Sequence, residues 1–136
     1  MTILFPAGKY RSELWKDSQL AGDFCLDQAV DGEDMVKKVR VKLKKEGQYD
    51  LIFINRQFPD ADGKTVLESV RNLENESGIV SSSGAVIVMT SDLWNKKEAL
   101  AAFSEGCDYY LPLPADQEML SAIIETTKND LELRRK

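Results

Sequence analysis

Uninterrupted apolar runs alternate with helical patterns along this chain. The clearest run is Leu51 to Ile54, which follows Tyr49 and stops at the polar residue Asn55. An apolar run without polar alternation is typical of a strand buried on both faces of a sheet. A loop rich in Pro, Asp and Gly follows, and a helical pattern begins after Gly63. These features predict the strand–loop–helix half of a βαβ unit, with Asn55 at the carboxyl end of the strand, where ligand sites of open parallel sheets lie.

The same alternation continues over the rest of the chain. Strands are expected at residues 2–5, 23–28, 50–54, 85–89 and 108–111. Helices are expected at about 9–21, from an N-cap at Asp31 to about 47, at 64–74, from a cap at Ser91 or Asp92 to about 105, and from about 116 onward. In the last helix one face is expected to carry Met119, Leu120, Ile123, Ile124 and Thr127. The pattern predicts an α/β fold, a three-layer α/β/α sandwich with a five-stranded parallel sheet in the flavodoxin-like order 2-1-3-4-5.

Length and composition narrow the possible functions. The 136 residues are expected to form a single domain. With 18 Lys and Arg against 23 Asp and Glu, the net charge of −5 argues against nucleic-acid binding by this domain. The chain has no His, which excludes a His general base and a His metal ligand. No apolar run is long enough to cross a membrane and no signal pattern is present, so the cytoplasm is the expected location.

The two cysteines, Cys25 and Cys107, are far apart in the sequence and form no CxxC pair. In the expected topology they lie on opposite edge strands, about 19 Å apart, beyond the reach of a disulfide bond. Both are expected to be buried small apolar residues.

The stretch around Asn55 resembles the central strand and loop of the receiver domain of two-component response regulators. That family has an apolar run, an Asp, three residues, Pro, two residues and Asp-Gly; here Pro59, Asp62 and Gly63 stand at the matching offsets. Further landmarks are Thr90, the run from Gly106 to Leu111, and Pro114, which is expected to follow a cis bond. The resemblance covers essentially the whole chain and implies the receiver type of the predicted fold.

Several reactive groups of a receiver are absent at the matching positions. Asn55 replaces the phospho-acceptor aspartate, and Leu113 stands where the family has a lysine. The acid pair that holds Mg²⁺ falls at Ala7 and Gly8, or one residue earlier, and neither register supplies a carboxylate. Of the reactive set only Thr90 remains. The resemblance therefore implies a degenerate, pseudo-receiver domain that is not an enzyme and for which no metal and no cofactor are expected.

Thr90 and Tyr110 resemble the pair whose rearrangement reports phosphorylation in receivers. They could still switch between two arrangements, or Thr90 could cap the turn after its strand while Tyr110 packs at the sheet edge.

Two alternatives of different chemistry stay open. Asp60 or Asp62 could act as a substitute phospho-acceptor or a weak metal ligand, although an Asp before Gly is typical of a turn. Residues 6–9 with Ser12 could form a phosphate loop for a flavin or nucleotide, as in a small enzyme of the same fold.

Two surfaces are candidates for protein partners. In receivers, partners and dimer mates bind the face built from helix four, strand five and helix five, where this chain has Trp94, Tyr109 and Tyr110. A homodimer through this face is an option that the resemblance leaves open. The basic run in residues 37–45 is either the solvated side of an amphipathic helix or a docking surface for an acidic partner. Residues 128–136 could extend the last helix as a linker to an effector domain.

The sequence thus predicts a two-component-type signalling domain that acts by binding proteins without being phosphorylated on aspartate.

Overall fold

The computed structural model describes residues 1–7, 25–45, 47–79, 84–92 and 95–134. Five strands form one parallel sheet: β1 (Thr2–Pro6), β2 (Cys25–Ala29), β3 (Leu51–Asn55), β4 (Val86–Ser91) and β5 (Tyr109–Pro112). Their order is β2-β1-β3-β4-β5. The predicted parallel sheet and its order are confirmed, and each strand lies within two residues of its predicted position.

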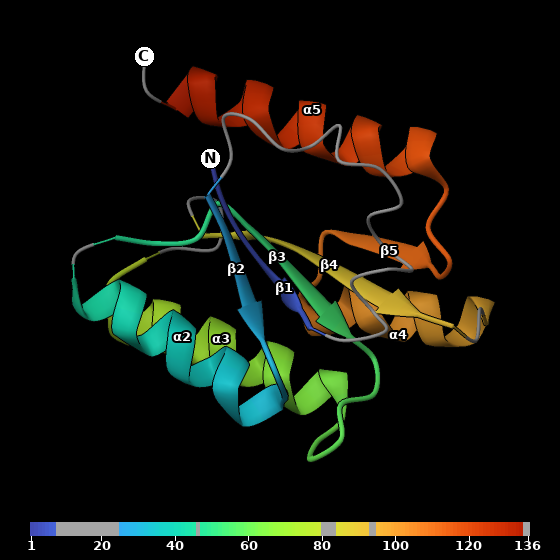
Figure 1. Ribbon diagram of the computed structural model, residues 1–136, viewed down its shortest axis with the longest axis horizontal. Helices are drawn as coiled ribbons and strands as arrows, with labels where there is room; N and C mark the ends of the chain where they lie inside the picture. Colours follow the sequence, from blue (N-terminus) through green and yellow to red (C-terminus); the bar gives the residue numbers. More distant parts are fainter. Residues whose placement is uncertain (8–24, 46, 80–83, 93–94, 135–136) are drawn as a thin grey trace.

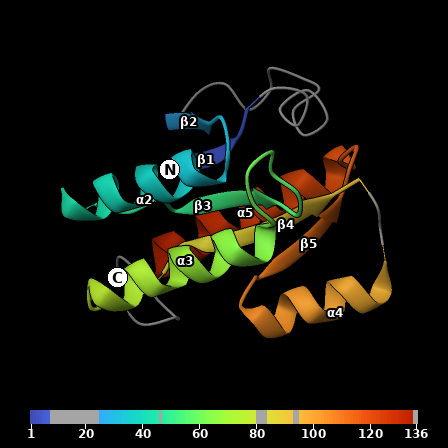
Figure 2. The same cartoon turned by 90° about the horizontal axis from the view of Figure 1, so that it is seen from below.

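The described helices are α2 (Gly32–Lys44), α3 (Gly63–Glu76), α4 (Lys96–Glu105) and α5 (Gln117–Arg134). Helices α2, α3 and α4 lie on one side of the sheet and α5 lies on the other, so the chain forms three layers (Figure 1). Figure 2 shows α2, α3 and α4 side by side along the sheet, with α5 behind the sheet. The helix predicted at residues 9–21 lies outside the described residues. None of the described helices is long and apolar enough to span a membrane.

Two apolar clusters fill the spaces between the layers. One joins α2 and α3 to the sheet and includes Met35, Val66 and Ile54. The other joins α5 to the opposite face of the sheet and includes Phe53, Leu111 and Leu120. Every residue of β3 is buried, which is the reason for its unbroken apolar run.

Capping residues set where the helices begin. Asp31 caps α2 as predicted, because its side chain accepts a hydrogen bond from Asp34 N at 2.7 Å. The prediction for α4 was wrong: neither Ser91 nor Asp92 caps it. Ser91 belongs to β4, and the helix begins at Lys96 with Asn95 as its N-cap. Asn95 satisfies the orphan N–H groups of the first turn equally well, so local sequence did not distinguish the two starts.

One burial prediction was also wrong, and one residue of the predicted face of α5 is exposed. Cys25 is exposed, whereas Cys107 is buried as expected. β2 is an edge strand, and four of its five residues are exposed, so an apolar residue there need not be covered. Met119 is 46% exposed, because the buried stripe of α5 begins one residue after it. That stripe consists of Leu120, Ile123, Ile124 and Thr127.

An ionic network that the sequence did not reveal joins α3 to the segments preceding β4 and β5. Arg71 pairs with Glu74 at 2.8 Å and with Asp108 at 3.1 Å, and it donates to the backbone carbonyls of Ala85 and Gly106. Glu74, 4% exposed, also accepts from Ala85 N at 2.7 Å. Buried charges need such partners, so this network holds the amino-terminal ends of the two strands in place.

Candidate functional site

Asn55 ends β3 at the carboxyl edge of the sheet, with 3% of its surface exposed. Its side-chain amide donates to the backbone carbonyl of Gln57 at 2.6 Å. Its side-chain oxygen accepts from the hydroxyl of Thr90, the residue paired with it on β4, at 3.3 Å. Both ends of the amide are therefore occupied within the protein. Such a group neither attacks phosphorus nor offers a charge to a cation.

The loop after Asn55 folds back onto the strand. Arg56 N donates to Thr90 O at 2.7 Å, and Gly63 N donates to Arg56 O at 2.6 Å. Gly63 starts α3 against this backbone: a Cβ atom there would lie 2.5 Å from the carbonyl oxygen of Asn55 and 2.8 Å from the Cα of Arg56. Pro59 lies exposed in the turn of the same loop. The close approach explains why a glycine follows Asp62.

Both candidate substitute carboxylates bind backbone N–H groups at helix starts. The two carboxylate oxygens of Asp60 accept from Gly32 N at 2.8 Å and Glu33 N at 3.0 Å, at the beginning of α2. Asp62 caps α3 by accepting from Thr65 N at 2.8 Å. These backbone hydrogen bonds lower the pKa of both carboxyl groups. The turn interpretation of Asp62 agrees with this geometry, and Asp60 ties the site loop to α2.

The other positions matched to reactive groups carry no charge. Ala7 follows β1, and its backbone N–H donates to Ala29 O at 2.8 Å; Gly8 lies outside the described residues. Leu113 is 7% exposed and belongs to the apolar cluster under α5. The bond between Leu113 and Pro114 is cis, as predicted.

The residues present do not fit a Mg²⁺ ion at this place. Ala7 has no ligand side chain, the Asn55 oxygen is neutral and already hydrogen-bonded, and the Asp60 oxygens bind α2, whereas Mg²⁺ prefers carboxylates. Within the ranges that the structure describes, no three His, Cys, Asp or Glu side chains gather as a metal site.

Thr90 and Tyr110 lie on neighbouring strands but point to opposite faces of the sheet. Thr90 pairs with Leu111, so these two side chains share a face, and Tyr110 as the preceding residue points to the other. The Tyr110 hydroxyl is buried and has no hydrogen-bond partner among the residues that the structure describes. Because Thr90 lies within β4 and bonds Asn55, it does not cap the turn after its strand.

The predicted partner face has a different set of exposed residues from the one the sequence suggested. Trp94 lies outside the described residues, Tyr109 is half-buried, and Tyr110 is 9% exposed and so offers little surface. Sequence reasoning missed Leu100 and Phe103 on α4, which are exposed. Their three-residue spacing places both on one helix face, away from buried Ala102. This spacing is the feature of the sequence from which the exposed apolar face could have been predicted.

No family model matches this chain. One curated relative is the hybrid signal transduction histidine kinase L of Dictyostelium discoideum, 27% identical over 100 residues. The match covers 74% of this chain but only 6% of the kinase, so the chain corresponds to a small part of that protein.

Solved structures resemble the chain over nearly its whole length. A mutant of the receiver domain of the histidine kinase CKI1 from Arabidopsis thaliana has a TM-score of 0.76 at 19% identity, covering 94% of this chain and 89% of that one. A two-component response regulator from Clostridium difficile has a TM-score of 0.68 at 23% identity, covering 94% and 95%. A CheY-like response regulator receiver domain from Methanospirillum hungatei has a TM-score of 0.68 at 14% identity, covering 96% of each chain. The chain has the receiver fold.

Proposed function

We propose that this chain is a receiver-like regulatory domain of two-component-type signalling that acts by binding proteins and is not phosphorylated on aspartate. On this proposal it is not an enzyme. Its conformation is either controlled by a partner or constitutively fixed. Residues 1–136 form a single domain, and residues 128–136 at the end of its last helix serve as a linker to an effector or partner domain.

The arrangement of Asn55 carries this proposal. The residue lies at the end of β3, where the resemblance puts the phospho-acceptor, and its amide joins Gln57 to Thr90. An amide nitrogen is a poor nucleophile, and here it is also committed to a carbonyl oxygen. The nearby carboxylates of Asp60 and Asp62 are held by the first turns of α2 and α3, which disfavours either as a substitute acceptor.

Electrostatics at the site agree with the loss of phosphoryl chemistry. A lysine in place of Leu113 would bury a cation among Phe5, Phe53 and Leu120, with no acidic partner at Ala7 or Asn55. An apolar side chain avoids this cost and fills the space under α5. The substitutions are therefore mutually consistent in physical terms.

The proposed partner surface lies around the β5 edge of the sheet. Leu100 and Phe103 of α4 are 62% and 45% exposed, and Met119 of α5 is 46% exposed. Exposed apolar side chains on the two helices that flank one sheet edge favour a protein partner there. The helix α5 continues unbroken through residues 128–134, which supports its use as a linker.

Amide NMR tests the absence of phosphoryl binding. Mg²⁺ and then beryllofluoride, a phosphoryl mimic, are titrated into the protein. We expect no saturable shifts at Asn55, Asp62 or Thr90. Shifts there would overturn the proposal and support phosphorylation on a substitute carboxylate, which mass spectrometry after treatment with a small phosphodonor would locate.

Sedimentation as a function of concentration tests a second copy of the chain as partner. If the copies pair through α4, the Leu100→Glu/Phe103→Glu variant is expected to be monomeric where the unaltered protein is dimeric. An unaltered protein that stays monomeric at every concentration excludes self-association and leaves a different protein as the partner.

A further inference from the structure

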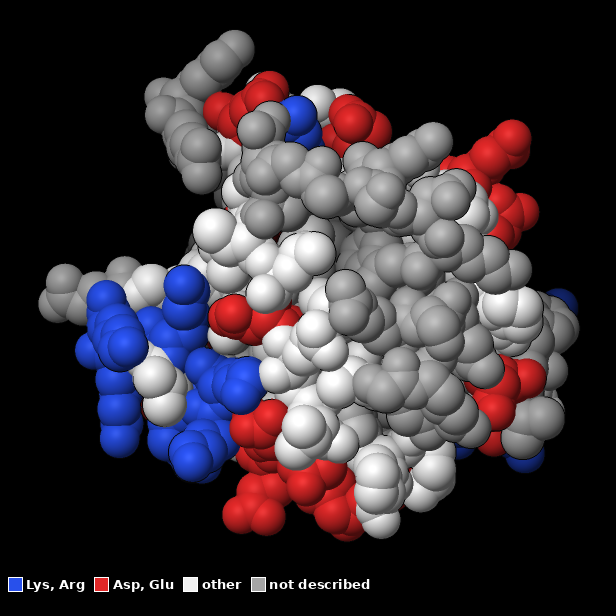
Figure 3. All heavy atoms as spheres, viewed as in Figure 1, with Lys and Arg blue, Asp and Glu red and all other residues white. Residues whose placement is uncertain are grey.

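Positive charge is concentrated in one short segment of an otherwise acidic chain. Six of the 18 Lys and Arg residues lie within residues 37–45, a segment without Asp or Glu, although the whole chain carries a net charge of −5. This segment is the carboxyl-terminal part of α2 together with Lys45, its C-cap. Figure 3 shows the resulting cluster of Lys and Arg on the side of the molecule where α2 lies.

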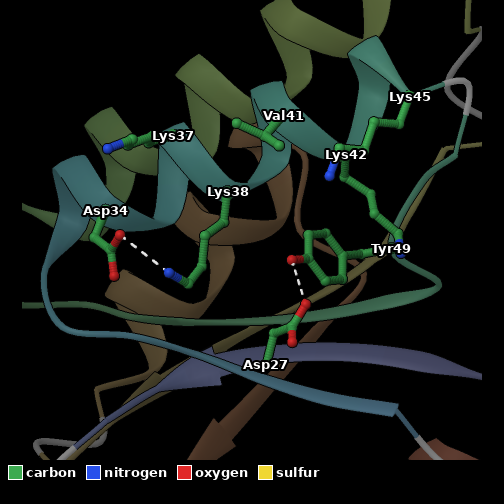
Figure 4. Close-up of a pocket in the computed structure, with 8 residues that line it drawn as sticks. All are labelled: Asp27, Asp34, Lys37, Lys38, Val41, Lys42, Lys45 and Tyr49. Carbon is green, nitrogen blue, oxygen red and sulfur yellow. Dashed lines mark hydrogen bonds and ion pairs between the residues drawn. The ribbon is translucent and has the colours of Figure 1, made fainter.

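The cluster borders a groove of about 400 Å³ between α2 and the β2 edge of the sheet. The lysines of α2 form one wall, and Tyr49 and Asp27 lie below the helix (Figure 4). The groove is lined by Asp27, Asp34, Lys37, Lys38, Val41, Lys42, Lys45 and Tyr49, and we call it the basic groove.

Internal contacts hold the floor of the basic groove. Tyr49 is 4% exposed, and its hydroxyl donates to the Asp27 carboxylate at 2.7 Å. The Nζ of Lys42 lies 5.5 Å from the centre of the Tyr49 ring, a cation–π distance. Tyr49 therefore fixes both an acid and a base of the groove.

The two acids of the basic groove already have partners, whereas three of its four lysines form no ion pair with a described carboxylate. Asp34 accepts from Val30 N at 2.9 Å and pairs with Lys38 at 3.2 Å, and Asp27 is bonded by Tyr49. Within the described part of the chain, no carboxylate pairs with Lys37, Lys42 or Lys45. The groove thus presents uncompensated positive charge to solvent.

The surroundings favour a polypeptide over other anions. Val41 lies among the lysines at 42% exposure, and Leu26 on the neighbouring β2 is 39% exposed, so apolar contacts accompany the charges. Nucleic acids and anionic membranes are extended negative surfaces, and a domain of net charge −5 repels them beyond the groove. A short acidic segment can match the local charge and also use the apolar contacts.

We propose that the basic groove binds an acidic, partly apolar polypeptide segment of another protein. Its Asp and Glu side chains pair with Lys37, Lys42 and Lys45, while an apolar side chain packs on Val41. This interaction goes beyond the proposed function, because the groove lies at the β2 edge and β5 is the opposite edge of the sheet. The two surfaces can be occupied together.

The test uses a fluorescein-labelled synthetic peptide in which Asp and Glu alternate with Leu, with Asn and Gln replacing the acids in a control peptide. We expect saturable binding of the acidic peptide, weakening at high salt, and amide NMR shifts along α2 and at Tyr49. Reversing two charges, Lys42→Glu/Lys45→Glu, is expected to weaken binding roughly tenfold or more. The milder Lys42→Gln/Lys45→Gln pair guards against misfolding and is expected to give an intermediate loss.

The matched control is Lys96→Glu/Lys97→Glu, which makes the same change in net charge at two exposed lysines of α4. We expect it to bind the peptide about as well as the unaltered protein, apart from a small long-range effect. The proposal would be overturned if the two charge-reversal variants lost affinity equally, or if the control peptide bound as tightly as the acidic peptide. The absence of saturable binding would overturn it too. Tighter binding of single-stranded RNA or of anionic vesicles would overturn it as well.

Discussion

The side-chain amide of Asn55 donates to the backbone carbonyl of Gln57 at 2.6 Å, and this bond closes the loop that follows β3. A carboxylate at the same place cannot donate, and its oxygens would repel that carbonyl. The position matched to a phospho-acceptor therefore has a structural role in this chain. Replacing the Asn55 amide by a carboxylate therefore does not simply restore a phospho-acceptor, because it also removes this hydrogen bond.

We predict that Asn55→Asp lowers the free energy of unfolding by about 1–3 kcal/mol, because a carboxylate cannot donate the hydrogen bond to the Gln57 carbonyl and would repel that oxygen from a buried position. Urea unfolding at neutral pH measures the change. Asn95→Asp is the matched control, since Asn95 caps α4 through its side-chain oxygen and an Asp caps equally well. If the two variants are equally stable, the Asn55–Gln57 bond contributes nothing.

The lowered pKa of Asp60 leads to a specific prediction of how stability depends on pH. Its hydrogen bonds from Gly32 N, then Glu33 N, lower its pKa below the ordinary value of 3.8. The folded state therefore binds this proton less readily than the unfolded state does. The stabilisation by Asp60 is present above pH 3.8 and is lost as the pH falls through the lower pKa of the folded state.

The stability difference between the unaltered protein and Asp60→Asn is accordingly expected to shrink as the pH falls below 3.8. Thermal unfolding of both proteins at neutral and acid pH gives this difference, since the remaining carboxyl groups titrate in both. A difference that stays constant with pH would show that the Asp60 carboxylate does not hold the start of α2.

Gly63→Ala is predicted to destabilise the protein by about 1–3 kcal/mol or more, because the new Cβ would overlap the backbone of residues 55 and 56. Gly47→Ala serves as control, because the nearest described atom outside its chain neighbours would lie 3.5 Å from the new Cβ. Comparing the urea midpoints of the two variants measures the effect. Similar midpoints would mean that α3 can shift away from the strand.

Arg71→Met is predicted to cost about 3–5 kcal/mol of unfolding free energy, since it leaves the carboxylate of Glu74 buried without its cation. Arg40→Met, at an exposed position of α2, is expected to change stability by no more than about 0.5 kcal/mol. Chemical denaturation distinguishes the two. A small loss in Arg71→Met would show that Ala85 N alone satisfies Glu74.

Periodicity in the sequence determined the fold of this protein. The unbroken apolar run of Leu51 to Ile54 requires burial on both faces, and strands of that kind are found in parallel sheets covered by helices. Caps such as Asp31 were also readable, because an N-cap acts on N–H groups only two or three residues away. That Asn55 and Ala7 supply no carboxylate could be read directly from the order of residues in the sequence.

Tertiary structure alone decided which partners each side chain has. The pairing of Asp60 with the start of α2 joins positions 28 residues apart, and that of Arg71 with Asp108 joins positions 37 apart. No local pattern encodes such contacts, because they depend on how the layers pack. The same holds for Cys25, which is exposed since β2 lies at an edge, and for the basic groove, which exists only where α2 passes over Tyr49 and Asp27.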